Sequence, residues 1–389
     1  MHPPKLVAIT LMIIMTLPLI SATPVKLWEY SDQCAVFSMD FNENGNLGLA
    51  FGYDAELLGS NGSLLMKAPS RGISYAIAVS NNNVVVTGTE GKWIQAFSNG
   101  KFLWEHKLED AVVSVDVSPD GNVAVAGDAS GYVYLVENGK LRWEKKVGGY
   151  VWSVLLYDNQ IYAGTTKKLV VLGLGGNVLK EIPREGDVRQ IVTTKGGLAL
   201  LEVPDSEDSS RVIAITPDGE VLWERDFDDF TKAIDSDGEG IAVAGYFGSV
   251  LLLNATNGEE VYSLPYLMAP FSVSTWKGYT LVSGDQSVDL IAPNGSVLWE
   301  KTFNGSVYHV KFSPTGFFVV EYGSHDLENC YSVITAWRLS ELASSTLFPS
   351  PGETTTPVGG RARVNKTILA LLGAGVVLML LLLWRERER

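Results

Sequence analysis

The sequence contains little of what most enzymatic and nucleic-acid-binding sites require. Only two cysteines and four histidines occur among 389 residues, too few for a disulfide scaffold or a cysteine-rich metal site. Acidic residues outnumber basic ones, 44 to 30, for a formal net charge of −14. A protein that binds nucleic acid needs a basic surface that displaces counterions. We therefore expect no nucleic-acid partner.

Local catalytic motifs are also missing. The sequence has no His-Glu-x-x-His pair, no nucleophile elbow and no phosphate-binding loop. The glycine-rich stretch 173–176 falls in a predicted hairpin turn instead of a strand-to-helix junction, so it is no dinucleotide fingerprint. A Ser-His-Asp triad stays open as an alternative, because triads assemble in space and not in sequence.

Two apolar segments near the ends of the chain predict export and membrane attachment. Residues 6–20 form an apolar run behind Lys5 and ahead of Ser21 and Ala22. This pattern is typical of a signal peptide over residues 1–22, cleaved after Ala22; an uncleaved anchor is the alternative. Residues 368–384 carry no charge, which is just enough length for a transmembrane helix, assigned to residues 367–384.

The segment before this helix predicts a spacer, and the segment after it a short tail. Residues 343–366 are rich in Ser, Thr, Pro and Gly, a composition that buries no core and favours an extended linker. A buried core helix at 368–384 is therefore the weaker alternative. We expect a single-pass cell-membrane protein whose folded part, residues 24–342, lies outside, with residues 385–389 as a cytoplasmic tail.

A turn followed by an aromatic residue and a glutamate recurs through the middle of the chain. The best copies lie at residues 99–105, 138–144, 218–224 and 294–300, and each ends in Trp-Glu. Degenerate copies surround Gly62, Gly176 and Gly258. The seven turn glycines are 37 to 43 residues apart. Such a fixed period predicts a repeat architecture.

Each repeat is predicted to contain four short strands. In the third repeat these are residues 112–118, 123–127, 132–137 and 141–146. The Asn-Gly and Asp-Gly pairs between them predict two-residue hairpins in which both central residues have positive φ. Four antiparallel strands in about 40 residues are typical of a β-propeller blade. No repeat shows the 3.6-residue period of paired helices.

The blade count predicts how the ring closes. Seven complete repeats occupy residues 35–302, and an eighth stops after its third strand at residues 331–337. The motif Leu27-Trp28-Glu29 stands at the mature N-terminus without a blade before it. We expect residues 25–31 to pair with 331–337 and complete the eighth sheet. The predicted fold is all-β, an eight-bladed β-propeller closed by the N-terminal strand, plus one C-terminal transmembrane helix.

Closure also predicts a use for the two cysteines. Aligning Trp28 with Trp299 puts Cys330 opposite about Asp32, with Cys34 two residues further on. An exported protein can form a disulfide there. The bond would close a loop of nearly the whole domain and stabilise the fold by about 4–5 kcal/mol in the chain-entropy model. Two unpaired thiols are the alternative.

The repeated turn-Leu-Trp-Glu motif resembles the PQQ-like, or quinoprotein-dehydrogenase-like, β-propeller family over residues 24–342. The family includes eight-bladed members in which a tryptophan on the outermost strand docks each blade on its neighbour. The resemblance implies this docking role for Trp28, Trp104, Trp143, Trp223 and Trp299. Met66, Lys180 and Tyr262 depart from the pattern.

The catalytic part of the resemblance is weaker than the structural part. Quinone-using members have a calcium site and often two adjacent cysteines under the cofactor, whereas Cys34 and Cys330 lie far apart in this sequence. Non-enzymatic members include a lipoprotein propeller that assists outer-membrane assembly. We expect no cofactor here; PQQ with calcium is the alternative. Acidic loop residues could supply oxygen ligands, although solvated loops are the simpler interpretation: Asp205, Glu207, Asp208, Asp226, Asp228 and Asp229.

The longer loops indicate which face of the ring binds. Second-to-third and blade-to-blade loops share one face, while the tight turns share the other, and variable loops on a rigid scaffold carry binding sites. We predict a monomeric binding or scaffolding module for an extracellular protein, peptide or glycan, similar to archaeal cell-surface proteins. A quinoprotein oxidoreductase or a propeller hydrolase is the alternative. Five sequons are candidate glycosylation sites: Asn61, Asn254, Asn294, Asn304 and Asn365.

Overall fold

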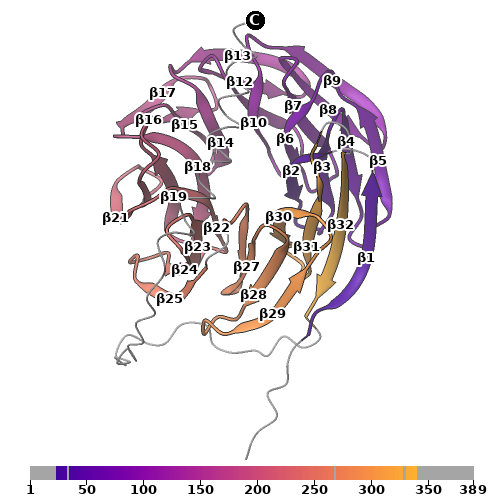
Figure 1. Ribbon diagram of the computed structural model, residues 1–389. Helices are drawn as coiled ribbons and strands as arrows, with labels where there is room; N and C mark the ends of the chain where they lie inside the picture. Colours follow the sequence, from indigo (N-terminus) through magenta and orange to yellow (C-terminus); the bar gives the residue numbers. More distant parts are fainter. Residues whose placement is uncertain (1–22, 33–34, 267–268, 327–329, 340–389) are drawn as a thin grey trace, which may run out of the picture. The chain divides into compact units, whose positions relative to one another are not determined.

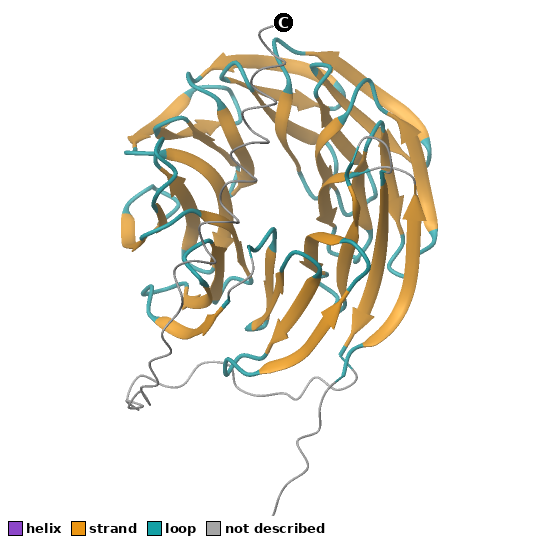
Figure 2. Ribbon diagram, in the orientation of Figure 1, coloured by secondary structure: helices purple, strands orange, loops and turns teal. Residues whose placement is uncertain are grey.

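The computed structural model of the chain describes residues 23–32, 35–266, 269–326 and 330–339. Thirty-two strands form eight four-stranded sheets with antiparallel pairing throughout. The described residues contain no helix (Figure 2). The sheets are arranged as blades around a common centre, with the first strand of each repeat innermost (Figure 1). The prediction of an all-β, eight-bladed propeller is confirmed.

The first four blades follow chain order from the innermost strand outwards. Blade I contains β2 (Val36–Phe41), β3 (Leu47–Phe51), β4 (Asp54–Leu58) and β5 (Leu64–Pro69). Blade II contains β6 (Ser74–Val79), β7 (Val85–Thr89), β8 (Trp93–Ser98) and β9 (Lys101–Lys107). Blade III contains β10 (Val112–Val117), β11 (Val123–Asp128), β12 (Tyr132–Glu137) and β13 (Lys140–Lys146). Blade IV contains β14 (Val151–Tyr157), β15 (Gln160–Thr165), β16 (Lys168–Gly173) and β17 (Val178–Pro183).

The last four blades complete the ring. Blade V contains β18 (Asp187–Thr194), β19 (Gly197–Val203), β20 (Ser210–Ile215) and β21 (Val221–Phe227). Blade VI contains β22 (Thr231–Ser236), β23 (Gly240–Gly245), β24 (Ser249–Asn254) and β25 (Glu260–Pro265). Blade VII contains β26 (Val273–Trp276), β27 (Tyr279–Ser283), β28 (Ser287–Ile291) and β29 (Val297–Thr302). Blade VIII contains β30 (Ser306–Phe312), β31 (Phe318–Ser324), β32 (Tyr331–Arg338) and, outermost, β1 (Val25–Asp32).

The apolar core lies between the blades. Within the described residues, eight buried clusters occur, one for each pair of neighbouring blades, including the pair formed by blades VIII and I. The middle strands contribute most, because both of their faces are covered; all five residues of β3 and all seven of β19 are buried. An unbroken series of eight interfaces means that the ring is closed by packing, and the hydrophobic effect acts around its whole circumference.

The N-terminal strand closes the ring as predicted. Strand β1 pairs with β32 from Val25 opposite Arg338 to Asp32 opposite Ser332, and Figure 1 shows these two sequence-distant strands side by side. Asp32 also forms an ion pair with Lys67 of β5, which in turn lies 2.8 Å from the buried Glu56 of blade I. The closing strand is therefore bound to blade VIII by its backbone and to blade I by its side chains.

The register corrects the expected position of the cysteines. Ser332, and not Cys330, lies opposite Asp32, so the predicted register is wrong by two residues. Cys34 lies outside the described residues, so the Cys34–Cys330 disulfide stays a prediction. The signal peptide (1–22), the spacer (343–366), the transmembrane helix (367–384) and the tail (385–389) also lie outside them. Among the described residues, no helix is both long and apolar enough to span a bilayer.

The turns between third and fourth strands are of two kinds. At 99–100 and 138–139 both the asparagine and the glycine have positive φ, as a two-residue hairpin requires. At Asn61 and Gly62 only the glycine does, with φ of 81°. The asparagine there accepts a hydrogen bond from the backbone N–H of Ser63 (3.1 Å), an Asx turn that closes a longer loop. The prediction of positive φ at both residues was wrong for this second kind.

Tryptophans on the outermost strands cover the turn glycines of the following blades. The contact is so close that a Cβ atom added to the glycine would lie within about 3 Å of the indole ring. The distances are 2.6 Å for Gly62 and Trp28, 3.0 Å for Gly139 and Trp104, 3.0 Å for Gly176 and Trp143, and 2.7 Å for Gly258 and Trp223. Three indole N–H groups donate to turn carbonyls: Trp28 to Ser60 (2.9 Å), Trp143 to Leu174 (2.8 Å) and Trp223 to Ala255 (3.0 Å). Only glycine allows both the positive φ and the close ring.

The fifth tryptophan and the three departures from the motif behave differently. Blade VIII has no such turn, because its fourth strand comes from the N-terminus, and Trp299 packs on Phe318 and Trp337 instead. Lys180 replaces the indole by donating its Nζ to the carbonyl of Asp218 (2.7 Å). Tyr262 covers Gly295, whose added Cβ would lie 3.0 Å away. Met66 covers no turn glycine.

Removal of one docking ring should weaken the whole fold. We expect Trp223→Ala to lower the free energy of unfolding by about 3 kcal/mol, because it deletes a large packed ring and leaves the carbonyl of Ala255 without its donor. The neighbouring Leu222 is 47% exposed, so Leu222→Ala should cost less than about 0.5 kcal/mol. Chemical denaturation of both variants measures this; equal midpoints for them would contradict the docking role.

Candidate binding face around the channel mouth

A repeated β-bulge shapes the mouth of the central channel. In seven of the eight innermost strands the register shifts by one residue at the second or third position, just after the blade-to-blade loop. Bulges re-aim side chains and are frequent at the rims of barrels and beside functional sites. The extra residues, in chain order, are Phe37, Tyr75, Val113, Trp152, Arg189, Lys232 and Tyr308.

These residues and their neighbours form a group that we call the aromatic mouth: Phe37, Tyr75, Tyr150, Trp152, Phe271, Tyr308 and His325. Tyr308 stacks on His325 with ring centroids 3.7 Å apart and contacts Phe271 at 5.6 Å. Phe37 lies 5.9 Å from Tyr75 and 6.5 Å from His325. Aromatic side chains that remain accessible on a rigid rim are common anchors of protein interfaces.

Part of this aromatic surface is open to solvent. Phe37 is 40% exposed and Tyr75 is 38% exposed. Tyr150 packs on Trp152 at 4.2 Å, and its pKa is raised by burial and by the nearby Tyr75 and Asp110. Large apolar side chains at the surface cost free energy unless something covers them. The mouth is therefore a candidate contact surface.

A cation completes the mouth next to Trp152. The guanidinium of Arg189 lies 4.8 Å from the centre of the Trp152 ring and 5.5 Å from that of Phe230. It also forms an ion pair with Glu207 of the β19–β20 loop at 2.5 Å. Burial and the neighbouring charge of Arg189 lower the pKa of Lys232. Aromatic, cationic and anionic groups thus meet at one place on the long-loop face.

His325 belongs to a buried polar cluster behind the mouth. The carboxylate of Glu321 is fully buried and lies 3.1 Å from His309 Nδ1 and 3.3 Å from His325 Nε2. Burial alone would raise the pKa of Glu321, but the hydrogen bonds with the two histidines outweigh it and lower the pKa. The cluster fixes the imidazole on which Tyr308 stacks.

The same cluster tests the triad alternative. Ser332 Oγ lies 3.4 Å from His325 Nε2, so serine, histidine and glutamate are adjacent. However, both the serine and Glu321 contact the same ring nitrogen, whereas a triad needs the base to receive the serine proton on one nitrogen and the carboxylate on the other. Ser332 is also fully buried. These three residues are not arranged for nucleophilic catalysis.

Polar side chains line the channel and bind the backbone of the next blade. Asp40 accepts from the N–H of Val79 (3.0 Å), and Gln190 both accepts from and donates to Ile234 (3.0 and 2.8 Å). Ser274 Oγ accepts from the N–H of Phe312 (3.0 Å). The inner edge of each innermost strand has no strand partner, and these side chains satisfy its donors.

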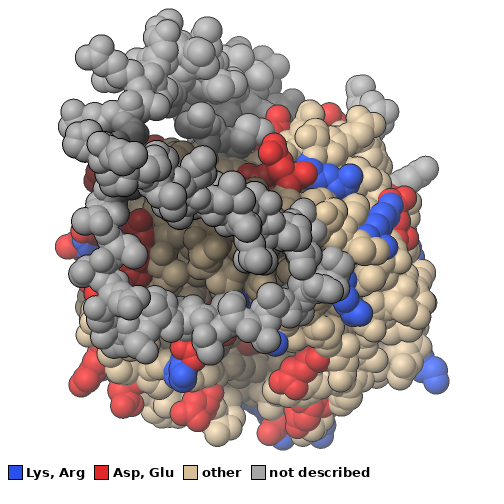
Figure 3. Space-filling view, turned by 90° about the horizontal axis from the view of Figure 1, so that it is seen from below, with Lys and Arg blue, Asp and Glu red and all other residues tan. Residues whose placement is uncertain are grey.

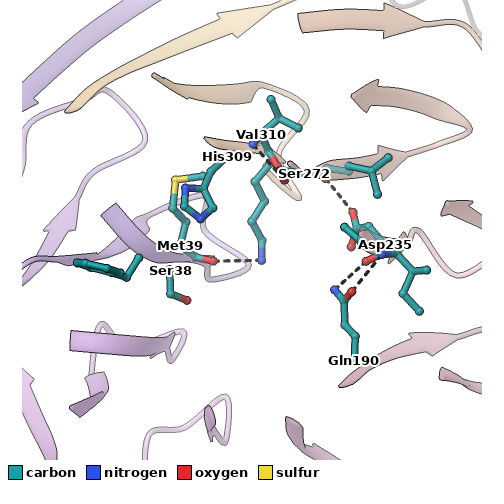
Figure 4. A pocket seen from close by; sticks show the side chains of 13 residues that line it. Ser38, Met39, Gln190, Asp235, Ser272, His309 and Val310 are labelled. Atoms are coloured by element: carbon teal, nitrogen blue, oxygen red, sulfur yellow. Dashed lines mark hydrogen bonds between the residues drawn. The ribbon is translucent and has the colours of Figure 1, made fainter. Parts of the chain in front are cut away.

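A small cavity in the channel is lined by residues of blade I and of blades V to VIII. Figure 4 shows Met39 and His309 on one side of a cavity and Gln190 and Asp235 on the other. Lys311 donates its Nζ to the carbonyl of Met39 at 3.3 Å. The cavity has a volume of about 210 Å³, below the range of roughly 300–1,000 Å³ of small-molecule sites. The wall is thus a structural network between blades.

Two channel carboxyls have strongly perturbed pKa values. Burial raises the pKa of Asp116 to about 7, with a further contribution from Asp40, against the hydrogen bonds donated by the N–H groups of Leu156 and Val117. Burial likewise raises the pKa of Asp235. Perturbed carboxyls often mark active sites. Here each carboxyl accepts backbone N–H bonds across a blade interface, which is a structural role.

The acidic loop residues do not converge on a cation site. Asp205 pairs with Lys167 (2.7 Å), Glu207 with Arg189 and Asp226 with Arg211 (both 2.5 Å). Within the part of the chain that is described, no group of three or more His, Cys, Asp or Glu side chains is placed to hold a metal ion.

The sequons occupy different settings. The side chains of Asn61, Asn254 and Asn294 accept backbone N–H bonds in their own turns (3.1, 2.8 and 3.0 Å). Asn304 lies exposed in the loop between β29 and β30, and Asn365 lies outside the described residues. Glycosylation at these positions stays a prediction.

Sequence reasoning predicts that the long-loop face binds a partner, but it does not identify the residues of the mouth. The aromatic residues lie at one repeat position, the bulged residue of the innermost strand, as in Phe37, Tyr75, Trp152 and Tyr308. Alignment of the repeats would have revealed this column. The alternation of inward and outward side chains along a single strand does not reveal the column, because the bulge shifts this alternation by one residue.

Comparisons with known proteins agree with the fold. A PQQ-like family model, described as outer membrane protein assembly factor BamB, matches residues 54–198. The crystal structure of BamB from Moraxella catarrhalis is similar, with a TM-score of 0.65 and 12% identity over 81% of this chain and 100% of that chain. The crystal structure of the computationally designed Ika8 protein is also similar, with a TM-score of 0.66 and 16% identity over 79% of this chain and 97% of that chain. No curated protein matches the chain by sequence. The resemblance to PQQ-like propellers is confirmed.

The raised pKa of Asp116 predicts a pH dependence of stability. A carboxyl with a folded-state pKa of about 7 and an unfolded value of about 3.9 binds its proton more tightly in the folded protein. The free energy of unfolding should therefore fall as pH rises from about 4 to about 7. Between pH 5 and 8 we expect Asp116→Asn to reduce this fall by on the order of 2 kcal/mol.

The exposed Asp120 is the matched control. Its side chain accepts hydrogen bonds within its own turn, which lower its pKa. Asp120→Asn should therefore leave the change in the free energy of unfolding between pH 5 and 8 as it is in the parent protein. Urea unfolding at several pH values measures the slopes. An unchanged slope in Asp116→Asn would show that its proton is not linked to folding.

Proposed function

We propose that this protein is a membrane-tethered extracellular propeller that acts as a binding or scaffolding module, and that its aromatic mouth is the contact surface. The observation that carries the proposal is the column of bulged aromatic residues, Phe37, Tyr75, Trp152 and Tyr308, around one end of the channel. Aromatic anchors on a rigid scaffold lose little conformational entropy on binding. The ring supplies that rigidity through its eight packed interfaces.

A protein or peptide partner fits this surface better than a small substrate. The mouth combines exposed rings with the ion-paired Arg189, the mixture of aromatic and arginine side chains that is enriched in protein interfaces. The family description that matches residues 54–198 names an assembly factor, which supports a scaffolding role. A glycan partner would use the same rings and is an outcome that the experiment below distinguishes.

The tether is proposed from the sequence. The uncharged run of residues 368–384 and the spacer of residues 343–366 would hold the propeller at the outer surface of the cell membrane. The acidic balance supports solubility and disfavours anionic partners. In Figure 3 acidic and basic side chains are interspersed over the surface shown, without a continuous basic patch.

The enzymatic alternatives receive no support from a specific observation. The serine, histidine and glutamate at Ser332, His325 and Glu321 lack the geometry of a hydrolase triad. The channel carboxyls Asp116 and Asp235 are engaged with backbone N–H groups. We propose a function that needs no cofactor.

Site-specific photo-crosslinking tests the proposed contact face. The full chain is expressed in its own cells with p-azidophenylalanine in place of Tyr75 or, as control, of Leu174. These two positions have nearly equal exposure, 38% and 37%, but Leu174 lies in the β16–β17 turn on the opposite face. We expect Tyr75 to give a discrete adduct that mass spectrometry identifies as a polypeptide, and Leu174 to give none.

The adduct should also depend on the mouth. When p-azidophenylalanine replaces Tyr75, the additional substitution Phe37→Ala should reduce the yield of the adduct at least fivefold. Equal yields at Tyr75 and Leu174, or a carbohydrate as the adduct, would contradict a protein-binding mouth.

A further inference from the structure

One docking position of the ring is vacant. Six of the seven turn glycines between third and fourth strands are covered by a side chain of the preceding blade, and the exception is Gly100 of blade II. A Cβ added at Gly100 would have no heavy atom within 4 Å. Met66, which stands where a tryptophan is expected, is only 3% exposed and packs in the cluster between blades I and II.

The turn of blade III shows what normally occupies this position. Both turns are Asn-Gly pairs with positive φ, 50° and 70° at 99–100 and 50° and 76° at 138–139. At the second, the Trp104 ring lies over Gly139, and His106 Nε2 bonds the Gly139 carbonyl at 3.0 Å. The residues at the same positions of blade I are Met66 and Ala68. Within the described residues, the turn of blade II therefore lacks both a covering ring and a side-chain donor.

A groove opens at this vacant position. It has a volume of about 460 Å³, within the roughly 300–1,000 Å³ of ligand sites. Its apolar part is formed by Ala68, Phe97, Gly100 and Phe102. Phe97 and Phe102 pack edge to face with centroids 6.1 Å apart, and Phe102 is 54% exposed. The groove continues the buried interface between blades I and II.

The polar end of the groove is already satisfied. Arg71 donates its Nε to Glu105 (2.6 Å) and its backbone N–H to Gln95 (2.8 Å), and Gln95 donates to Glu105 (3.1 Å). No free charge there calls for an ionic ligand. What the groove lacks is a flat ring over Gly100 with a hydrogen-bond donor at its edge.

We propose that this groove binds a tryptophan side chain of a partner polypeptide, which takes the place that Trp104 and its equivalents take over the turns of four other blades. The indole would pack against Phe102 and over Gly100, where the absence of a Cβ leaves room for a ring. The chain itself supplies the argument for the occupant: three indoles already donate to turn carbonyls in the equivalent grooves. This site is separate from the aromatic mouth and stands whether or not the proposed function holds.

A small indole probe tests the site directly. Binding of N-acetyl-tryptophanamide to the full chain in detergent micelles is followed by saturation-transfer difference NMR, with N-acetyl-leucinamide as the control ligand. We expect saturable binding of the tryptophan derivative with a millimolar Kd. Phe102→Ala should weaken it at least tenfold, whereas Leu103→Ala should not change it. Leu103 is the adjacent residue of β9, is 46% exposed and is not among the residues that line the groove.

Filling the vacancy provides a second, independent variant. Met66→Trp with Ala68→His copies the blade III pair and should abolish probe binding while the thermal unfolding midpoint stays equal or rises. If that variant does not fold, the comparison of Phe102→Ala with Leu103→Ala decides alone. The proposal would be overturned if the tryptophan and leucine derivatives received equal saturation transfer. It would also be overturned if the parent chain and Phe102→Ala bound the tryptophan derivative equally well.

Discussion

The pairing of β1 with β32 is the constraint on which the rest of the structure depends. The last blade packs fully against the first only if its sheet is complete. Here the fourth strand of blade VIII comes from the N-terminus. That strand also carries Trp28, which covers Gly62 of blade I, and Asp32, which pairs with Lys67. One strand thus bonds the last sheet and packs on the first. Without it, the apolar cluster between blades VIII and I, against which Trp28 and Tyr30 pack, would lose part of its cover.

Closure determines the geometry of the channel and its mouth. Each innermost strand exposes one edge to the channel, and side chains such as Asp40 and Gln190 bind the backbone of the following blade. The bulges at the start of these strands then project their extra residues at one end. The mouth is therefore a product of the repeat itself, with the residue at one position varied from blade to blade. The vacant position at Gly100 has the same origin, because it differs from its equivalents by two side chains.

Much of this architecture could be predicted from the sequence, for physical reasons. Turn glycines at a fixed spacing identify the blades, and Trp28 without a blade before it identifies the closing strand. The register near Asp32 differs from the prediction by two residues, because the turn motif places a strand in the sheet but does not determine which residues of two sequence-distant strands pair. The bulged residues were missed, because Tyr75 and Trp152 look like ordinary strand positions until the backbone pairing is known. Met66 was recognised as a departure, but whether another side chain covers Gly100 depends on packing that sequence does not reveal.

Native-state hydrogen exchange of β1 tests the central claim most directly. In the full chain, the amides of β1 should exchange with the same free energy of opening as those of β13, an outermost strand joined to its neighbour by a hairpin. This result is expected if the closing strand is part of the cooperative ring. Rapid exchange of β1 while β13 remains protected would show that the ring holds together without its N-terminal strand, and would contradict the account.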